Sequence, residues 1–312
     1  MIPACAHFVW FGAHLPYAYI LGVRSAALRG GFDEVLIHHA DVLAQTDELK
    51  AALELPGVGL RPLNEGTLES APIDRAGALV DLFRKLEQPA AKANMMRAAI
   101  LATQGGVYLD TDTLMLKDFD TLRAEHSVFC GAEHIALPST VKDSRNPLIW
   151  ARAGAMMLYR DVCRRQTRGW HHFRRVEHFY PAVANNAILA SEPGHPFIMS
   201  LLNGMLDLPA QQQLVRFALG TKLLQQMVSR DPEGCSVLPP ELFFPIGPEV
   251  SQHWFREDTA GDLEQMLHAH TRLIHWYASV RTKVIVPQIS PDFVRTHADS
   301  MAFCKAALPF VN

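Results

Sequence analysis

AILATQGGVYLDTDTLMLKDF, residues 99–119, is the most informative stretch of this 312-residue chain. A segment with helical spacing ends at Gly105 and Gly106, and the apolar run after the glycines predicts a buried strand. Asp110 and Asp112 follow, one residue apart. Because strand side chains alternate between the two faces of a sheet, both carboxylates are expected to face the same spot.

Two carboxylates this close repel each other and raise one pKa unless a cation lies between them. Mg²⁺ and Mn²⁺ bind oxygen ligands, typically one or two carboxylates together with substrate phosphates. The pair therefore favours a divalent metal that bridges Asp110 and Asp112 to a diphosphate. A solvated turn with two surface aspartates is the alternative, because Asp-x-Asp by itself is a weak signal.

The residues before this stretch alternate between strand and helix patterns. Three apolar runs are typical of buried strands: residues 7–11, 34–39 and 57–63. Residues 15–32 have helical character and end at a double glycine, and residues 76–103 predict two helices divided by Pro89. This order predicts parallel α/β winding, and sites in such sheets lie at the carboxyl ends of the strands.

The alternation of strand and helix patterns is weaker after residue 119. Further strands are predicted at residues 127–133, 235–239 and 272–276. Further helices are predicted at residues 195–207, 218–229 and 291–306. No internal repeat and no low-complexity linker divides the chain, so a single domain over residues 1–312 is expected.

The composition limits the class of protein. Hydrophobic residues make up 49% of the chain and charged residues 20%, and the formal net charge of −3 excludes a globally basic nucleic-acid binder. The five cysteines form no Cys-x-x-Cys pair, which favours a reduced, cytoplasmic protein without a cysteine zinc site. No apolar window reaches the length of a transmembrane helix, and the N-terminus lacks a basic signal-peptide start, so a soluble protein is expected.

Residues 139–180 differ from the rest of the chain in charge. They contain nine Lys or Arg and three acids, and nine minus three leaves +6 in a chain whose net charge is negative. We predict a basic helical insertion. Its charge has three interpretations: a solvated helical face, a contact with an anionic membrane that carries a lipid-linked acceptor, or a nucleic-acid site. No recognition fold accompanies the segment, which argues against nucleic acid.

Residues 91–120, AKANMMRAAILATQGGVYLDTDTLMLKDFD, resemble the sugar-binding Asp-x-Asp region of a glycosyltransferase family. The family includes bacterial capsule and lipopolysaccharide enzymes, fungal mannosyltransferases and, more distantly, the clostridial glucosylating toxins. Further segments resemble the family in the same order along the chain: IPACAHFVWFG (2–12), NNAILASEPGHPF (185–197), VLPPELFFPIG (237–247) and HWYASV (275–280).

The resemblance implies a GT-A fold, which is a Rossmann-like, mixed and mostly parallel sheet flanked by helices. It implies a retaining hexosyltransferase that uses a nucleotide-sugar, with UDP-sugars favoured, and Mn²⁺ or Mg²⁺ as cofactor. The acceptor would be a hydroxyl of a glycan, a lipid-linked molecule or a protein, and no nucleic-acid partner is implied. Polysaccharide biosynthesis is the expected role, in the cytoplasm or peripheral to the inner face of the membrane.

The resemblance also implies a donor site. Trp10, with Val9 beside it, would stack on the nucleobase. Arg97 would bind sugar hydroxyls or phosphate through its guanidinium. The other donor-binding residues implied are Asn94, Tyr108, Asp110, Asn186 and Ser279. The family has Ser-Asp where this chain has Ala93 and Asn94, which leaves the choice of donor sugar open.

A metal site and a catalytic set are implied as well. Asp112 and the distant His275 would bind the metal directly. Asp110 would bind it directly or through a water molecule. Asp110, Asp112 and Arg97 would form the catalytic set.

Two other interpretations stay open. VYLDTDTLML also fits the opening motif of haloacid-dehalogenase-type phosphatases, in which Asp110 would be the nucleophile and Asp112 the acid and base. That family places the motif near the start of the chain and has a later Gly-Asp-x-x-x-Asp for Mg²⁺, whereas GDLEQM here ends in Met266. The second alternative is a relative that binds carbohydrate without turnover. The departures at Asn94 and at Val280, where the family has Trp, motivate it.

Overall fold

The computed structural model describes the chain except residues 143, 216–217 and 279–281. The strands are β1 (Cys5–Trp10), β2 (Glu34–His39), β3 (Val58–Pro62), β4 (Gly106–Leu109), β5 (Thr113–Met115), β6 (Val128–His134), β7 (Ala182–Ser191), β8 (Ser236–Leu238) and β9 (Leu273–His275). The α-helices are α1 (Tyr17–Arg29), α2 (Asp47–Leu53), α3 (Gly66–Glu69), α4 (Ala76–Lys85), α5 (Pro89–Gln104), α6 (Asp120–Glu125), α7 (Ser139–Lys142), α8 (Pro147–Arg165), α9 (Gly169–Arg174), α10 (Pro196–Asp207), α11 (Ala210–Gln213), α12 (Leu223–Arg230), α13 (Pro240–Phe243), α14 (Leu263–Met266), α15 (Pro291–His297) and α16 (Ala302–Ala307). Short 3-10 or π segments are η1 (Glu177–Phe179), η2 (Ala218–Lys222), η3 (Ser251–Phe255), η4 (Ala260–Asp262), η5 (Val286–Gln288) and η6 (Leu308–Phe310).

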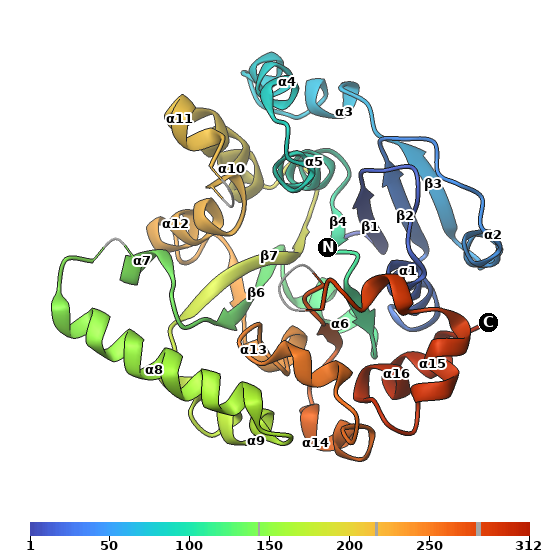
Figure 1. Cartoon of the computed structure of the whole chain (residues 1–312). Helices are drawn as coiled ribbons and strands as arrows, with labels where there is room; N and C mark the ends of the chain where they lie inside the picture. The colour runs from blue at the N-terminus through green and yellow to red at the C-terminus, as the bar shows by residue number, and fades with distance from the viewer. Residues whose placement is uncertain (143, 216–217, 279–281) are drawn as a thin grey trace.

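Seven strands form one central sheet in the order β3-β2-β1-β4-β7-β6-β8 (Figure 1). The pairs β1–β2, β2–β3, β1–β4 and β6–β8 are parallel, whereas β7 runs antiparallel to both β4 and β6. The predicted mixed, mostly parallel sheet flanked by helices is confirmed. β5 and β9 form a separate antiparallel pair.

Both faces of the central sheet are buried, because neighbouring residues of one strand pack into different cores. On β4, Val107 and Leu109 belong to the larger core, and Tyr108 between them belongs to the second core. The larger core includes residues of α1, α15 and α16, and the second includes residues of α4, α5, α10 and α12 (Figure 1). Strands buried on both faces give continuous apolar runs, which explains why β1 and β4 are visible in the sequence.

The double glycine after α5 ends the helix as predicted and also permits close packing. Gly105 and Gly106 have φ of +68° and +97°, a region that L side chains rarely adopt. A Cβ at Gly106 would lie 2.6 Å from the carbonyl oxygen of Cys5 and 2.8 Å from Nε2 of His7. The turn thus lets the chain pass from α5 directly into β4, beside β1.

Several expectations need correction. β7 was not predicted as a strand, because the polar Asn185 and Asn186 interrupt its apolar pattern, and β5 is too short to be visible. The strand predicted at 272–276 exists as β9 but pairs with β5, outside the central sheet. The helix predicted at 218–229 begins as the π segment η2, and the helix predicted at 291–306 is divided into α15 and α16.

Residues 139–180 form α7, α8, α9 and η1, so this segment is helical as predicted. Four of its arginines bind other parts of the chain: Arg160, Arg164, Arg168 and Arg174. Their partners include the carboxylates of Glu249 and Asp262. The solvated basic face is therefore smaller than the charge count indicates. The organisation of residues 1–312 as one domain with this segment as an insertion stays a prediction.

Among the described residues, no helix is both long enough and apolar enough to cross a membrane.

Candidate active site

A cavity of about 890 Å³ lies where β1 and β4 end, at the carboxyl edge of the sheet. Nine of the ten predicted site residues line it: Val9, Trp10, Asn94, Arg97, Tyr108, Asp110, Asp112, Asn186 and His275. The tenth, Ser279, lies outside the described residues. The fold therefore brings together residues of β1, α5, β4, β7 and β9, which are far apart in the chain.

Asp110 follows β4 directly, and two neighbours hold its carboxylate. Tyr108 donates its hydroxyl to Oδ1 of Asp110 at 2.9 Å, and Arg97 donates from Nη2 to the same oxygen at 3.0 Å. The Arg97 guanidinium lies over the Tyr108 ring, 4.1 Å from its centroid, and also donates to the backbone carbonyl of Asn186. Because Arg97 is buried, its charge is held in one orientation toward the cavity.

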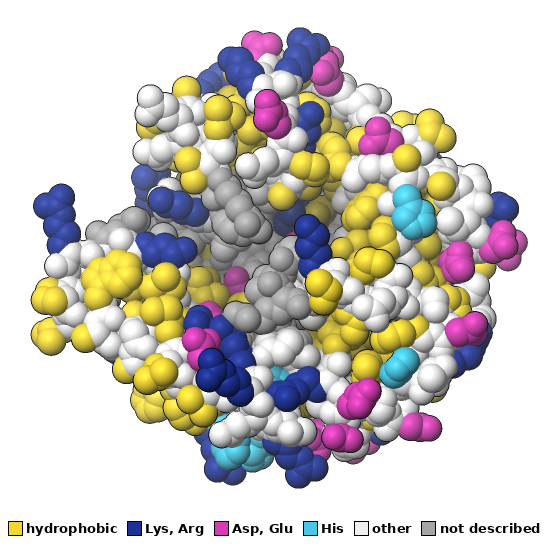
Figure 2. Space-filling view, in the orientation of Figure 1, with side chains coloured by type: hydrophobic (Ala, Val, Ile, Leu, Met, Phe, Trp, Pro, Cys, Tyr) yellow, Lys and Arg dark blue, Asp and Glu magenta, His cyan; other side chains and the backbone are white. Residues whose placement is uncertain are grey.

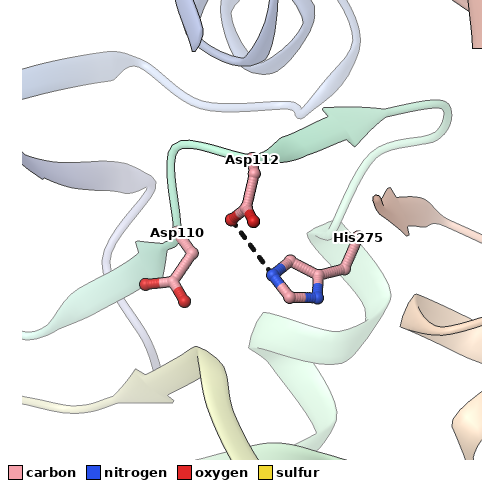
Figure 3. A group of neighbouring side chains, drawn as sticks. All are labelled: Asp110, Asp112 and His275. Carbon is pink, nitrogen blue, oxygen red and sulfur yellow. Dashed lines mark hydrogen bonds and ion pairs between the residues drawn. The ribbon is translucent and has the colours of Figure 1, made fainter. Parts of the chain in front are cut away.

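Asp112 lies in the turn between β4 and β5, and its two oxygens have different partners (Figure 3). Oδ1 lies 3.0 Å from Nε2 of His275, and Oδ2 accepts from the backbone N–H of Ala278 at 2.7 Å. The pairing of β5 with β9 sets Thr113 opposite His275 and brings this histidine to the aspartate. A small sheet that the sequence did not reveal thus brings Asp112 into contact with His275, the distant residue expected to share a metal with it.

The two aspartates lie in different electrostatic environments. Burial raises the pKa of Asp110, and the positive charge of Arg97 offsets only part of this effect. Burial acts in the same direction on Asp112, but His275 brings the pKa of Asp112 below its usual value. Burial would lower the pKa of His275, yet Asp112 raises it above its usual value. These shifts favour an ion pair between the carboxylate of Asp112 and the imidazolium of His275.

The chemistry of Asp110, Asp112 and His275 fits a divalent metal. One ligand atom of each residue lies within 4.8 Å of the others. Carboxylate oxygens suit Mg²⁺ and Mn²⁺, and an imidazole nitrogen is more usual for a transition metal. Nδ1 of His275 is buried and has no hydrogen-bond partner among the described residues, so the ring holds an unused polar atom at the site.

Trp10 lines the cavity at the end of β1, and a hydrogen bond and a ring contact hold its side chain in place. Its Nε1 donates to the carbonyl of His14 at 3.1 Å. Its ring packs against Tyr19, with the centroids 5.1 Å apart, and Tyr19 in turn stacks on the buried Trp276. Val9 is buried beside Trp10. This aromatic cluster offers a rigid surface for a planar ring, and Tyr19 is a member that the sequence did not indicate.

A chain of neutral side chains borders the cavity next to α5. Asn186 donates from Nδ2 to Oδ1 of Asn94 at 2.9 Å, and Thr221 donates its hydroxyl to Oδ1 of Asn186 at 3.1 Å. Gly220 makes room for this chain, because a Cβ there would lie 2.6 Å from Nδ2 of Asn94. Thr221 was not predicted as a site residue, because residues 218–229 show only an ordinary helical pattern.

Glu133 is a buried carboxylate in the cavity that no local pattern reveals. It lies in β6 and accepts the hydroxyl of Tyr277 at 2.9 Å, and burial raises its pKa. Tyr277 has a φ of +57°, which is uncommon for a residue other than glycine, and its ring centroid lies 4.1 Å from that of His275. Only the placement of β6 and β9 in the fold brings Glu133 and Tyr277 to the site.

Glu249 and two arginines of α8 form the wall of the cavity on the α8 side. Arg160 and Arg164 pair with Oε2 of Glu249 at 3.0 Å and 2.8 Å. Its Oε1 accepts from the backbone N–H of Ala136 at 2.7 Å. The inner face of the basic segment therefore belongs to this site.

Comparison with known proteins points to one class. Residues 40–129 match the family described as "Glycosyltransferase sugar-binding region containing DXD motif". This match includes Asn94, Arg97, Tyr108 and both aspartates, and it confirms the resemblance and the enzyme class, a glycosyltransferase, that the sequence predicted. No curated protein matches the chain.

Three of the solved structures that resemble the chain are glycosyltransferases. PaToxG glycosyltransferase shares 13% identity over 74% of this chain and 70% of its own, with a TM-score of 0.47. Mouse xyloside xylosyltransferase 1 shares 14% identity over 88% and 98%, with a TM-score of 0.48. The galactosyltransferase LgtC, solved with donor and acceptor sugar analogues, shares 11% identity over 94% and 99%, with a TM-score of 0.40.

Proposed function

We propose that this protein transfers a hexose from a nucleotide-sugar, with a UDP-sugar favoured, to an acceptor hydroxyl with retention of configuration and with Mn²⁺ or Mg²⁺. The convergence of Asp110, Asp112 and His275 within 4.8 Å at the edge of the sheet carries the proposal. An aromatic surface and a buried arginine border this cluster. Together these groups suit the three parts of such a donor: base, diphosphate and sugar.

In this proposal the donor lies along the cavity from Trp10 to Asn186. Trp10 and Val9 bind the nucleobase, and stacking on an aromatic ring contributes about 1–3 kcal/mol. The sugar hydroxyls and phosphates have the polar groups of the same wall as partners: Asn94, Arg97, Tyr108, Asp110 and Asn186. A phosphate contact for Ser279 rests on the resemblance alone.

Asp112 and His275 would hold the metal, with Asp110 directly or through water. When bound, a divalent ion acts as a Lewis acid toward a leaving diphosphate. His275 must release the proton that its pairing with Asp112 favours before its nitrogen can act as a ligand. Arg97 holds Asp110 in place and directs a fixed positive charge at the site, which suits a donor that carries negative charge.

The acceptor in this proposal is a hydroxyl of a glycan, a lipid-linked molecule or a protein, as in polysaccharide biosynthesis. Arg160 and Arg164 place the inner face of α8 beside the cavity, which suits an acceptor that enters from this side. A cytoplasmic location and a peripheral contact with an anionic membrane through residues 139–180 belong to the same proposal.

The phosphatase alternative has less support. Its later acidic candidate, Asp262, pairs with Arg168 at 3.2 Å and is not among the described residues that line the cavity. The nucleophile it needs, Asp110, has one oxygen bound to both Arg97 and Tyr108. Neither arrangement suits an aspartyl-phosphate intermediate.

The test combines metal binding with donor hydrolysis. Calorimetry with Mn²⁺ and a panel of UDP- and GDP-sugars should find one donor that binds, and its hydrolysis should stop when the metal is removed. Asp112→Asn should lose Mn²⁺ binding and at least about 100-fold of the hydrolysis rate. Asp47→Asn is the matched control, because the Asp47 side chain is 98% exposed.

Two outcomes would contradict the proposal. Turnover of nitrophenyl phosphate without a sugar donor would favour the phosphatase. Tight binding of a sugar nucleotide and Mn²⁺ with no hydrolysis and no transfer would favour the non-catalytic relative.

A further inference from the structure

The outer face of α8 is apolar, which is the reverse of the usual pattern for a helix at the surface. Outward positions of this helix recur at helical spacing: Leu148, Ala151, Ala155, Leu158, Tyr159 and Val162. Leu148 is 76% exposed, Leu158 69% and Val162 46%. Phe179, which is 56% exposed, adjoins this row because its carbonyl accepts from Arg152. We call these seven residues the α8 stripe.

The charges around the α8 stripe are almost all positive. Four arginines of the segment make no ion pair with any residue that the structure describes: Arg145, Arg152, Arg165 and Arg175. The acid on this helix, Asp161, is already paired with Arg160 and Arg164. Figure 2 shows hydrophobic side chains gathered over α8, with Lys and Arg near the edges.

We infer that α8 is an interfacial helix that lays the α8 stripe on the surface of an anionic lipid bilayer. Contiguous exposed apolar side chains mark a docking site rather than an ordinary surface. An apolar row with arginines beside it matches a membrane surface, where acyl chains lie beneath negative head groups. The 19 residues of α8 do not cross the bilayer, because its inner face carries Arg160 and Arg164 and lines the cavity.

A second copy of the chain fits the same face less well. Two α8 helices packed about a two-fold axis through the stripe would bring Arg152 and Arg165 of one copy close to the same two arginines of the other, and like charges at short distance repel. A bilayer presents the opposite charge to the same residues. The α8 stripe also lies on a convex helix rather than in a groove, which suits a broad fluid surface.

This inference deepens the proposed function in one respect only. With α8 on the bilayer, the cavity behind it lies close to the lipid surface, so the acceptor is attached to lipid. That consequence rests on the proposed function, which already includes a membrane contact through residues 139–180. The inference adds the surface that makes this contact, the α8 stripe, and vesicle binding tests it without donor turnover.

Vesicle flotation with the full chain tests the inference. The wild type should float with vesicles of phosphatidylcholine and phosphatidylglycerol, should not float with phosphatidylcholine alone, and should be released by salt. Leu158→Gln with Val162→Gln should reduce the bound fraction at least about tenfold. Leu28→Gln with Val42→Gln, exposed apolar residues outside the stripe, should bind as the wild type does.

Two further measurements separate the outcomes. Arg152→Gln with Arg165→Gln should bind anionic vesicles weakly at any salt concentration, and all variants should keep donor hydrolysis and thermal midpoint. Wild type that stays unbound at low salt, or a Leu158 and Val162 variant that binds normally, overturns the inference. A dimer in solution that this variant converts to monomer assigns the stripe to a second copy instead. If the wild type binds vesicles but does not hydrolyse any donor, the result contradicts the proposed transferase activity and leaves the assignment of the α8 stripe intact.

Discussion

Single residues in this site are arranged so that each aspartate of the Asp-x-Asp pair has its own cationic partner. Arg97 accompanies Asp110, and His275 accompanies Asp112. The two partners differ in kind, because a guanidinium keeps its proton at any ordinary pH whereas an imidazole can release one. The His275 pair is therefore the one in which the cationic partner can release a proton and open for a metal.

Arg97→Lys tests the geometric part of the site. Lysine keeps the positive charge but cannot reach Asp110 and the carbonyl of Asn186 together while stacking on Tyr108. We expect donor hydrolysis to fall by roughly 10- to 100-fold with Mn²⁺ binding largely retained, because misplaced groups reduce rate more than affinity. Steady-state kinetics and calorimetry measure the two effects. Arg75→Lys, at an exposed ion pair, is the control, and equal rates in both variants would refute this role.

At the scale of elements, the site depends on one turn and one strand pair. The glycine turn between α5 and β4 sets Arg97 and Asp110 on the same side of the sheet, and the pairing of β5 with β9 brings His275 to the site. The glycine turn tolerates little change. Gly106 has backbone and a histidine ring in the space that a Cβ would fill.

Gly106→Ala should therefore destabilise the protein by roughly 2–4 kcal/mol, from backbone strain at positive φ and from the clash with Cys5 and His7. Gly77→Ala in α4 is the matched control, because a Cβ there meets nothing within 4 Å. That variant should gain about 0.5–1 kcal/mol from helix propensity. Urea unfolding of both variants gives the comparison, and equal midpoints would show that the turn adapts.

On the scale of the whole molecule, two buried histidines make stability depend on pH. His7 on β1 donates from Nε2 to the carbonyl of Gly105, and its Nδ1 lies 3.0 Å from Nε2 of His38 on β2. Burial lowers the pKa of His7 to about 4 and the pKa of His38 to about 3. Both rings are neutral when the chain is folded at neutral pH.

Acid should unfold the protein through this pair. Histidine in the unfolded chain has a pKa of about 6.5, so between pH 6.5 and 4 the unfolded state binds more protons and stability falls as pH falls. The loss from pH 7 to pH 4.5 should be about 2–3 kcal/mol for each ring. Burial also lowers the pKa of His253 to about 4, so this ring adds a similar contribution. His38→Gln should therefore remove about a third of the histidine-dependent loss of stability, measured as urea midpoints against pH. His270→Gln, at an exposed residue, should leave the slope unchanged, and an unchanged slope in both would refute the assignment.

Much of the site could be predicted because the relevant residues are close in the chain. Asn94, Arg97, Tyr108 and the two aspartates lie within one helix, turn and strand, whose periodicity is visible without any partner. Glu133, Thr221 and Tyr19 were not found, because each reaches the cavity only through the packing of separate elements. The same reason explains the missed strands β5 and β7, which gain their structure from their neighbours rather than from local propensity.

The amino-acid sequence by itself determined the α/β order of elements, the sharp turn at Gly105 and Gly106, and the adjacent carboxylates, since these follow from local sterics and hydrophobic periodicity. The tertiary structure alone decided which cation accompanies each carboxylate, which arginines of residues 139–180 turn inward, and which apolar side chains remain uncovered on α8. Burial and long-range pairing depend on the whole chain, and no short segment contains them.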